Sequence, residues 1–241
     1  CLDNEEIQGI LPRLRKRFLT YGMASQADVQ AREVEMREFA SSFEILHRDR
    51  PLGRILVGMP GKHNVLNALA AIAVGLELEL DPGDIKAGLR NLGGLARRFQ
   101  VKGERGGVLF VDDYGHHPTE IVHTLETART CWPEQRLVVV FQPHRYSRTR
   151  ALFDRFVLSF NQADVLVVTP IYGAGEEPVE GVDSEWLCRG IKRHGHREVI
   201  LGRDLDWIRD RLHGIVKAGD VVITLGAGDV HRVGDRLMEE L

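Results

Sequence analysis

Four short segments gather three of the chain's four tyrosines, together with adjacent histidines and clustered charges, and each follows a short apolar run. The segments are Asp112–Pro118, Gln142–Arg150, Pro170–Glu176 and Gly226–Asp229. Ligands bind beyond the carboxyl ends of the strands in an open parallel sheet, so residues directly after strands are the first candidates for a site. Each segment alone could be an ordinary polar connection. Four of them on one predicted edge favour a functional site.

The second segment has the chemistry of an anion site. Its cationic side chains are His144, Arg145, Arg148 and Arg150. They lie where a helix is predicted to begin, and cations at a helix N-terminus oppose the helix dipole. An anion between the arginines and the helix N–H groups would resolve this conflict, because guanidinium groups bind carboxylate or phosphate bidentately. The alternative is that Asp154 and other acids pair with the arginines across the surface.

The first segment carries an acidic pair and a histidine pair. Asp112 and Asp113 could bind a metal or two ribose hydroxyls, or could cap a turn. Because adjacent carboxylates point in different directions, one role for each is favoured over a shared site. His116 and His117 make a poor zinc pair without further ligands at suitable spacing. We therefore assign no metal ligand in this chain.

Asparagine and arginine pairs are the candidates in the first half of the chain. Asn64 fits a helix N-cap, and Asn67 lies one helical turn further on, so both amides can face one ligand. An asparagine amide offers a donor and an acceptor, which suits an adenine edge. Arg97 and Arg98 follow a double glycine at a predicted domain junction, where they could contact phosphate or simply form a solvated surface pair.

Two nucleotide-binding patterns fail on inspection. Gly58–Lys62 is followed by histidine in place of serine or threonine, so it does not match a Walker loop. Gly226-Ala227-Gly228 follows an apolar run, but His231 stands where the third glycine of a dinucleotide fingerprint belongs.

The elements that must position these residues alternate regularly in the second half of the chain. Apolar runs at 108–111, 137–141, 165–169, 198–201 and 221–225 predict strands, and helices are predicted at 118–130, 149–161, 184–193, 204–213 and 229–241. Strands alternating with helices predict an α/β fold with a doubly wound parallel sheet. We place the domain boundary near Arg98, which gives domains 1–98 and 99–241.

Shorter elements are predicted in the first half. Strand-like runs at 17–21, 28–37, 42–47 and 54–57 precede an alanine-rich helix from Asn64 to about Glu79. A second helix begins with Asp81 as its N-cap and Pro82 at its first position, and Gly93 and Gly94 end it.

The composition bears on partners and location. The formal net charge of −3 gives no general attraction to nucleic acid or an anionic membrane. No apolar run reaches the roughly 18 residues of a membrane span. Widely spaced cysteines and the lack of a signal peptide favour a cytoplasmic location. Since the chain begins at Cys1 without methionine, we expect it to be part of a longer protein.

In order along the chain, these motifs resemble those of the Mur ligase family. The matching stretches are Pro60–Ala68, Arg97–Phe99, Val111–Glu120, Phe141–Thr149, Tyr172–Glu176 and Gly226–Asp229. The Tyr-Gly-His-His form and the His-Arg pair of the second segment are most similar to the alanine-adding members. The related murein peptide ligases usually differ at both places.

The resemblance implies an ATP-dependent amide ligase of peptidoglycan synthesis. Members phosphorylate the carboxylate of UDP-N-acetylmuramate with ATP and magnesium, and L-alanine then attacks the acyl phosphate. By motif, His63, Asn64 and Asn67 would contact adenine and Arg98 the ATP phosphates, and Asp112 or Asp113 would take the ribose or orient the domain interface. The alanine and the acyl phosphate would be held by Tyr114, His116, Arg145 and Arg148.

The same resemblance sets the expected domains. Residues 1–98 would be the end of the family's central ATPase domain, and residues 99–241 its Rossmann-like C-terminal domain. The family's Walker loop, its magnesium ligands and its UDP-binding domain would belong upstream, so the missing N-terminal part is an expected partner and no activity is expected from this chain alone. The alternatives are a murein peptide ligase, or a non-catalytic nucleotide- or anion-binding module of a split ligase.

Overall fold

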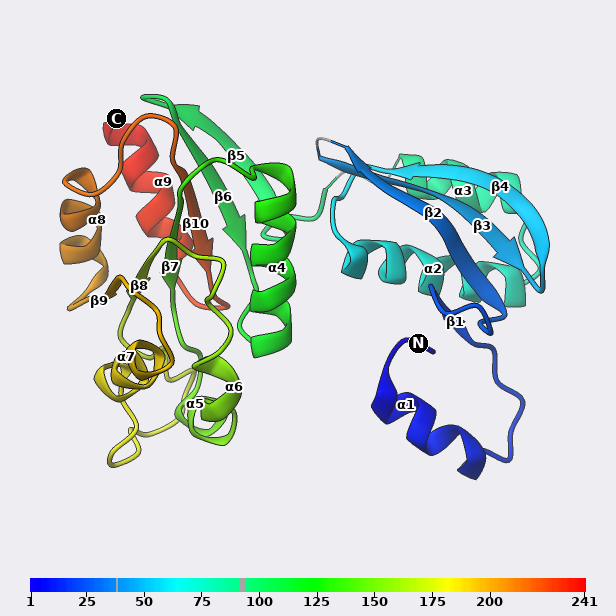
Figure 1. The fold of residues 1–241 in the computed structure, drawn as a ribbon, viewed down its shortest axis with the longest axis horizontal. Coiled ribbons are helices and arrows are strands. Elements are labelled where there is room, and N and C mark those ends of the chain that lie inside the picture. The colour runs from blue at the N-terminus through cyan, green and yellow to red at the C-terminus, as the bar shows by residue number, and fades with distance from the viewer. Residues whose placement is uncertain (38, 92–93) are drawn as a thin grey trace. The chain divides into compact units, whose positions relative to one another are not determined.

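The chain folds into two compact units, Cys1–Gly94 and Leu95–Leu241 (Figure 1). This computed structural model describes residues 1–37, 39–91 and 94–241. The predicted boundary at residues 98 and 99 lies four residues beyond the division between the units. Each unit has its own hydrophobic core.

The first unit is a four-stranded sheet with helices. Its elements are α1 (Glu5–Ile10), a 3-10 turn (Leu11–Arg13), β1 (Tyr21–Gly22), β2 (Val29–Arg37), β3 (Ala40–His47), β4 (Arg50–Val57), α2 (Lys62–Glu77) and α3 (Pro82–Arg90). The strand order is β1-β2-β3-β4, with β1 parallel to β2 and the other neighbours antiparallel. Alternate residues of the strands face α2, so Phe43, Ile45 and Ile55 pack against Leu69 and Ile72.

The two helices after this sheet begin differently from each other. The prediction that Asn64 caps α2 is wrong: the helix begins at Lys62, and its N-cap is Gly61 with φ +104°. Glycine reaches that backbone region without steric cost, so the helix can begin before the asparagine. The Asp81 cap of α3 is confirmed, since its side chain accepts from the N–H of Gly83 at 2.7 Å. The predicted end at Gly93 lies outside the described residues.

The second unit is the predicted doubly wound sheet with one additional strand. Its elements are β5 (Gln100–Arg105), β6 (Val108–Asp113), α4 (Pro118–Cys131), β7 (Leu137–Phe141), α5 (Tyr146–Ala151), α6 (Phe153–Phe156), β8 (Val165–Val168), α7 (Ser184–Arg193), β9 (Val199–Leu201), α8 (Leu205–His213), β10 (Val221–Leu225) and α9 (His231–Glu240). The order is β5-β6-β10-β7-β8-β9, and all neighbours are parallel except β5 and β6. The five predicted parallel strands are therefore confirmed.

Strand β5 was not predicted because its sequence is largely polar. It is the outermost strand of the sheet, beside β6, and its side chains are mostly exposed. It joins β6 through Gly106 and Gly107, both with positive φ. A Gly-Gly pair between two strands is typical of a tight hairpin turn.

Helices cover both faces of this sheet (Figure 1). Along β7, Val139 and Phe141 face the cluster that includes Ile121 of α4. Val138 and Val140 face the cluster that includes Ile208 of α8. All five residues of β7 are buried, which is why the sequence of this central strand is continuously apolar.

The segment predicted as one helix over 149–161 is shorter and broken. Helix α5 begins earlier, at Tyr146, and ends before Leu152, whose backbone (φ −112°, ψ +17°) separates it from α6. Phe156 and Phe160 pack on Phe141 beyond this break, at centroid distances of 5.7 and 5.0 Å. None of the helices in the described ranges is long and apolar enough to cross a membrane.

Candidate functional site

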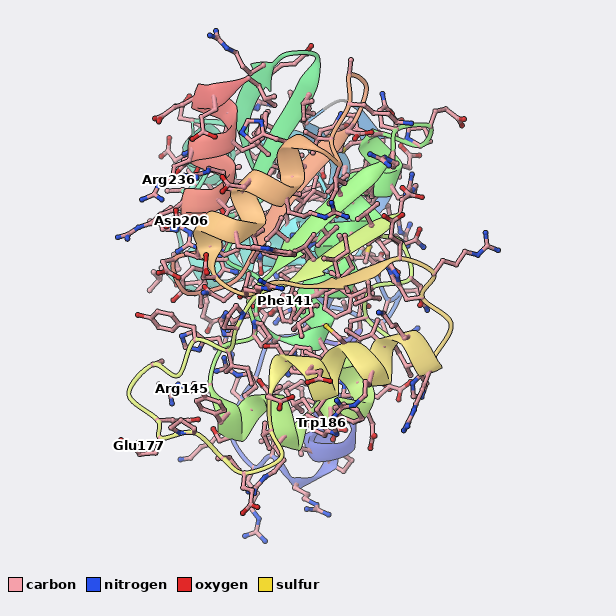
Figure 2. The ribbon with its side chains drawn as sticks, turned by 90° about the vertical axis from the view of Figure 1, so that its left-hand side faces the viewer. Phe141, Arg145, Glu177, Trp186, Asp206 and Arg236 are labelled. Atoms are coloured by element: carbon pink, nitrogen blue, oxygen red, sulfur yellow. The ribbon has the colours of Figure 1, made fainter. Side chains whose placement is uncertain are left out.

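The parallel strands of the second unit end in register at one edge of the sheet. Leu225 of β10 pairs with Asp113 of β6 and with Phe141 of β7, and Phe141 pairs with Val168 of β8. The four segments singled out in the sequence therefore start from the same edge. Figure 2 shows Arg145 beyond Phe141, in the loop that leaves β7.

A row of aromatic and imidazole rings crosses this edge. Tyr114 meets His116 edge-on at a centroid distance of 5.4 Å, and His116 lies 5.5 Å from His144. His144 in turn stacks on Tyr172 at 5.5 Å. The row joins three of the four segments. Tyr172, which is 41% exposed, adds a ring to the site that was not among the predicted site residues.

The arginine loop is fixed to the neighbouring loop after β8. The backbone N–H of Arg145 donates to the carbonyl of Tyr172, and the N–H of Tyr172 donates to the carbonyl of Pro143, both at 2.8 Å. Arg145 itself has φ +73°, a region that side chains with a Cβ rarely adopt. Strained backbone of this kind is concentrated at functional sites, and here the paired loops maintain it.

Helix α5 has only six residues, so Arg148 and Arg150 lie in its last turn and do not oppose the helix dipole. The N–H of Ser147 is already occupied, because Glu176 accepts from it at 2.9 Å and from the hydroxyl at 2.6 Å. These bonds, with the charge of Arg145, lower the pKa of the Glu176 carboxyl. An external anion would thus be bound by arginine side chains and not by the N–H of Ser147.

The arginines of this loop, Arg145, Arg148 and Arg150, form no ion pair with an acid within the described part of the chain. The predicted alternative partner Asp154 therefore does not neutralise them. Arg148 instead lies 3.3 Å from Nδ1 of His144. Burial, and then the positive charges of His116, Arg148 and Arg145, lower the pKa of His144. A neutral His144 can accept from Arg148, which leaves the cationic charge of this loop on the arginines.

The two aspartates at the end of β6 are buried and bind different partners. Asp112 accepts from the hydroxyl of Thr224 at 2.6 Å and from Nε of Arg97 at 3.0 Å. Asp113 accepts from the N–H groups of Phe99 and Gly115, at 2.7 and 2.6 Å. Burial raises the pKa of Asp113 to about 6, against the opposing effect of these two N–H donors. Both residues are buried, and their carboxylates organise the backbone around the site.

Glu120 is a residue of this edge that the sequence did not single out. Its carboxylate accepts from the N–H groups of His116 and His117, each at 3.0 Å, in a capping box at the start of α4. Burial alone would raise the pKa of Glu120, but these bonds and the charges of His116 and Arg98 outweigh it and lower the pKa. The retained charge lies 3.6 Å from the Arg98 guanidinium. The capping pattern in the sequence, with Glu three residues after the cap, was the signal that could have revealed it.

In the first unit, the predicted adenine contacts all lie at the start of α2. The side-chain amide of Asn64 donates to the carbonyl of Pro60 at 2.7 Å, and that of Asn67 lies 3.4 Å from the Asn64 oxygen. His63 precedes them on the helix. The two amides therefore lie together, and their binding of adenine stays a prediction.

Within the described ranges, no group of three or more His, Cys, Asp or Glu side chains could hold a metal ion. The arginines left unpaired within the described residues give this edge the chemistry of recognition by charge. Arginine guanidinium groups can bind a carboxylate or phosphoryl group, and the ring row can enclose a small substrate beside them.

Comparison with known proteins assigns the class. The sequence model described as "Mur ligase, glutamate ligase domain" matches residues 97–228, and that of the "Mur ligase middle domain" matches residues 1–75. The chain belongs to the Mur ligase family.

Among its relatives, the chain is 53% identical over all 241 residues to a UDP-N-acetylmuramate–L-alanine ligase of Geotalea daltonii, of which it covers 52%. It is 51% identical to the ligase of the same name from Desulforapulum autotrophicum and covers 53% of it. The chain therefore spans about half the length of the curated relatives it matches.

Solved structures agree on the fold. The UDP-N-acetylmuramate–alanine ligase of Thermotoga maritima superimposes with a TM-score of 0.76 at 26% identity, over 92% of this chain and 47% of that one. A murein peptide ligase of Psychrobacter arcticus gives a TM-score of 0.65 at 26% identity, over 91% and 45%. A MurF ligase of T. maritima, solved in complex with ADP, gives 0.68 at 22% identity over 99% and 53%, and supports the fold alone.

Proposed function

We propose that this chain is part of an ATP-dependent ligase that joins L-alanine to UDP-N-acetylmuramate in peptidoglycan synthesis. The observation that carries the proposal is the 53% identity over the whole chain to a relative with that name.

In this proposal, residues 1–98 form the end of the central ATP-binding domain and residues 99–241 form the C-terminal ligase domain. The enzyme would act in the cytoplasm.

In this function, the carboxyl edge of the second unit binds the incoming amino acid. Arg145 and Arg148 bind the alanine carboxylate or the phosphoryl group of the activated substrate, because they are the cations of this loop that adjoin the ring row, Arg145 through its backbone bond to Tyr172 and Arg148 through His144. Tyr114 and His116, at the other end of the ring row, form the wall beside them. When bound, ATP supplies the phosphoryl group that converts the muramate carboxylate into an acyl phosphate.

The nucleotide-binding roles that the family resemblance implies are supported for each residue separately. Arg98 fits a phosphate contact because its side chain is 45% exposed, so its guanidinium can reach a ligand although it also lies 3.6 Å from the Glu120 carboxylate. Asn64 and Asn67, with His63, offer amide and imidazole groups that fit an adenine edge. Asp112 and Asp113 would take the ribose or act by holding the backbone of the second unit at Arg97, Phe99 and Gly115. The magnesium ligands would lie upstream of this chain, as the family resemblance implies.

The 241 residues alone would not catalyse the reaction in this proposal. They contain no Gly-Lys-Thr loop that could clamp the γ-phosphoryl group. The supporting test joins this chain to the N-terminal half of the G. daltonii relative and measures ADP formation that depends on both UDP-N-acetylmuramate and L-alanine.

Arg148→Ala and Arg150→Ala are the matched variants in that fusion. Both arginines lie in the last turn of α5, but only Arg148 contacts the ring row. A hydrogen bond to a charged group contributes about 1.5–3 kcal/mol, so Arg148→Ala should lower kcat/KM for L-alanine by about 10- to 100-fold. Arg150→Ala should leave it nearly unchanged.

Three other outcomes of the fusion experiment would contradict parts of the proposal. Equal losses in the two variants would contradict the anion role of Arg148. A fusion that is active with a preformed peptide and not with L-alanine would favour the murein peptide ligase. A folded fusion that binds nucleotide without forming ADP would favour a non-catalytic module.

A further inference from the structure

Arg97 connects parts of the second unit that are far apart in the sequence. Its guanidinium donates to the Asp112 carboxylate at 3.0 Å, to the carbonyl of Gly228 at 3.1 Å and to the carbonyl of Gly226 at 2.5 Å. The same group lies over the ring of Tyr114, 5.1 Å from its centroid. One side chain therefore joins the end of β6, the loop after β10 and the ring row.

The backbone of Arg97 is fixed as firmly as its side chain. Its N–H donates to the side chain of Gln100 at 3.0 Å, and its carbonyl accepts from the N–H of Tyr114 at 2.7 Å. The residue has φ +58°, an unfavourable value that these contacts maintain. Arginine suits this place because a planar guanidinium can serve several acceptors in one plane, whereas a lysine ammonium cannot reproduce that geometry.

The next residue is directed to the same ring. The Arg98 guanidinium lies 5.4 Å from the Tyr114 centroid and 3.6 Å from Glu120. Since Arg97 and Arg98 are adjacent, fixing the backbone of Arg97 also sets where the side chain of Arg98 starts. Tyr114 thus has two guanidinium groups against its ring, and only that of Arg97 is held by carboxylate and carbonyl oxygens together.

We propose that Arg97 is a positioning residue that holds Tyr114 and Arg98 in the arrangement needed for binding amino acid and nucleotide. This inference rests on the proposed ligase function and adds a residue to it. Arg97 touches neither substrate in this proposal. It acts through Tyr114, Arg98 and the Gly226–Gly228 loop.

A purely structural role is the competing explanation, and the same sheet supplies its control. Arg136 donates to Asp220 at 2.8 and 3.1 Å and to the carbonyl of Ile215 at 2.6 Å. Arg136 and Asp220 come directly before β7 and β10, at the opposite edge from the site. Both pairs join an arginine to a buried aspartate and to backbone carbonyls, so Arg136→Lys should perturb the fold in the way that Arg97→Lys does.

The first experiment measures steady-state kinetics of the fusion described above. Arg97→Lys keeps the positive charge beside Asp112, which guards against unfolding, but loses the contacts to the two carbonyls. We expect the KM for L-alanine to rise at least tenfold, with a smaller change in kcat. In Arg136→Lys the same KM should stay within twofold of the wild type. Equal KM changes in the two variants would overturn the proposal.

A double variant tests whether Arg97 acts through the tyrosine. In a Tyr114→Ala background, Arg97→Lys should raise the KM for L-alanine by less than twofold, because Tyr114, the group through which it affects alanine binding, is gone. Full additivity of the two substitutions would contradict the inference.

Hydrogen exchange of the 241-residue chain separates failure of this inference from failure of the proposed function. Arg97→Lys should speed exchange at least tenfold at the amides of Phe99, Tyr114 and Gly226, and Arg136→Lys should not. If the wild-type fusion forms no alanine-dependent ADP, the ligase proposal fails, and exchange alone decides on Arg97. Unchanged exchange in Arg97→Lys would refute its positioning role whatever the activity.

Discussion

Two arginine–aspartate pairs lie at opposite edges of the same parallel sheet. Arg136 and Asp220 precede β7 and β10, whereas Arg97 approaches Asp112 at the end of β6. The aspartates are similarly buried, with side chains 1% and 5% exposed, and the arginines are 30% and 24% exposed. Local chemistry alone therefore does not distinguish the two pairs.

What differs is the surroundings of each arginine. Arg136 contacts the Asp220 carboxylate and the backbone carbonyl of Ile215. Its hydrogen bond to Asp220 is the largest cause of the raised pKa of Arg136. Arg97 adds the carbonyls of a second loop and the face of Tyr114. The carboxyl edge of an α/β sheet is where ligand-binding loops meet. In our proposal, the same interaction therefore stabilises the fold at one edge and arranges a site at the other.

The largest expected effect is on stability, and it should be equal at the two edges. Arg97→Ala and Arg136→Ala each leave a buried aspartate without its cation, which costs about 3–5 kcal/mol of unfolding free energy. Trp132, Trp186 and Trp207 all lie in the second unit, so urea unfolding followed by tryptophan fluorescence reports this unit. A difference above about 1.5 kcal/mol between the variants would break the structural equivalence of the pairs.

The second effect concerns Asp113, which lies beside the Arg97 pair at the carboxyl edge. Its pKa is raised from 3.8 to about 6, so the folded state binds a proton between these pH values that the unfolded state has lost. Unfolding free energy from this group therefore falls as the pH rises through the window. About two pKa units at 1.36 kcal/mol each correspond to about 3 kcal/mol.

Asp113→Asn removes this titration and gives the measurement its reference. The unfolding free energy of the wild type minus that of Asp113→Asn should fall by about 3 kcal/mol between pH 4 and pH 7. Other carboxyl groups cancel in the difference. A flat difference across this range would show that Asp113 titrates normally in the folded chain.

The third effect tests the carbonyls that Arg97 contacts. A Cβ on Gly228 would meet the side chains of Gln142 and Tyr172, the latter at 2.9 Å, so Gly228→Ala should cost about 1–3 kcal/mol through overpacking. Gly219, at the other edge, has open space around it but φ +93°, and Gly219→Ala should cost about 1–2 kcal/mol.

Coupling to Arg97 distinguishes these two glycine variants. Gly228→Ala displaces an acceptor of Arg97, so its cost should not add to that of Arg97→Lys, whereas the cost of Gly219→Ala should. Double-variant unfolding measurements give both coupling energies. Coupling of Arg97 to Gly219 as large as to Gly228 would show that Arg97 acts on the whole sheet.

The sequence predicted the parallel sheet well because buried strands are continuously apolar, as Leu137–Phe141 shows. It missed β5, which is polar and recognisable mainly by the Gly106-Gly107 turn. It also placed the start of the α5 helix three residues late, because Arg145 adopts a positive φ that its residue type does not suggest.

The site was predictable in its location and less so in its internal contacts. The loops that form the site could be predicted from the sequence because parallel strands all end at the same edge of the sheet, whatever their order within it. Arg97 was expected to contact phosphate or to lie on the surface, and its bonds to Asp112 and to the Gly226–Gly228 loop, like those of Glu176, could not be predicted, since partners of Arg97 and Glu176 lie 131 and 29 residues away along the chain. Such contacts depend on register between strands, which local patterns do not specify.

The smallest expected effect comes from a third pair on the same sheet. Lys102 of β5 lies 3.1 Å from Asp235 of α9, and their side chains are 32% and 36% exposed. Water and salt screen a partly exposed pair, so a double-mutant cycle of Lys102→Ala and Asp235→Ala should give about 0.2–1 kcal/mol, smaller still in high salt. A coupling energy of about 3–5 kcal/mol, as expected for loss of a buried pair, would mean that burial of the aspartate does not set the strength of these ion pairs. The difference between the two edges would then depend only on the carbonyl and ring contacts of Arg97.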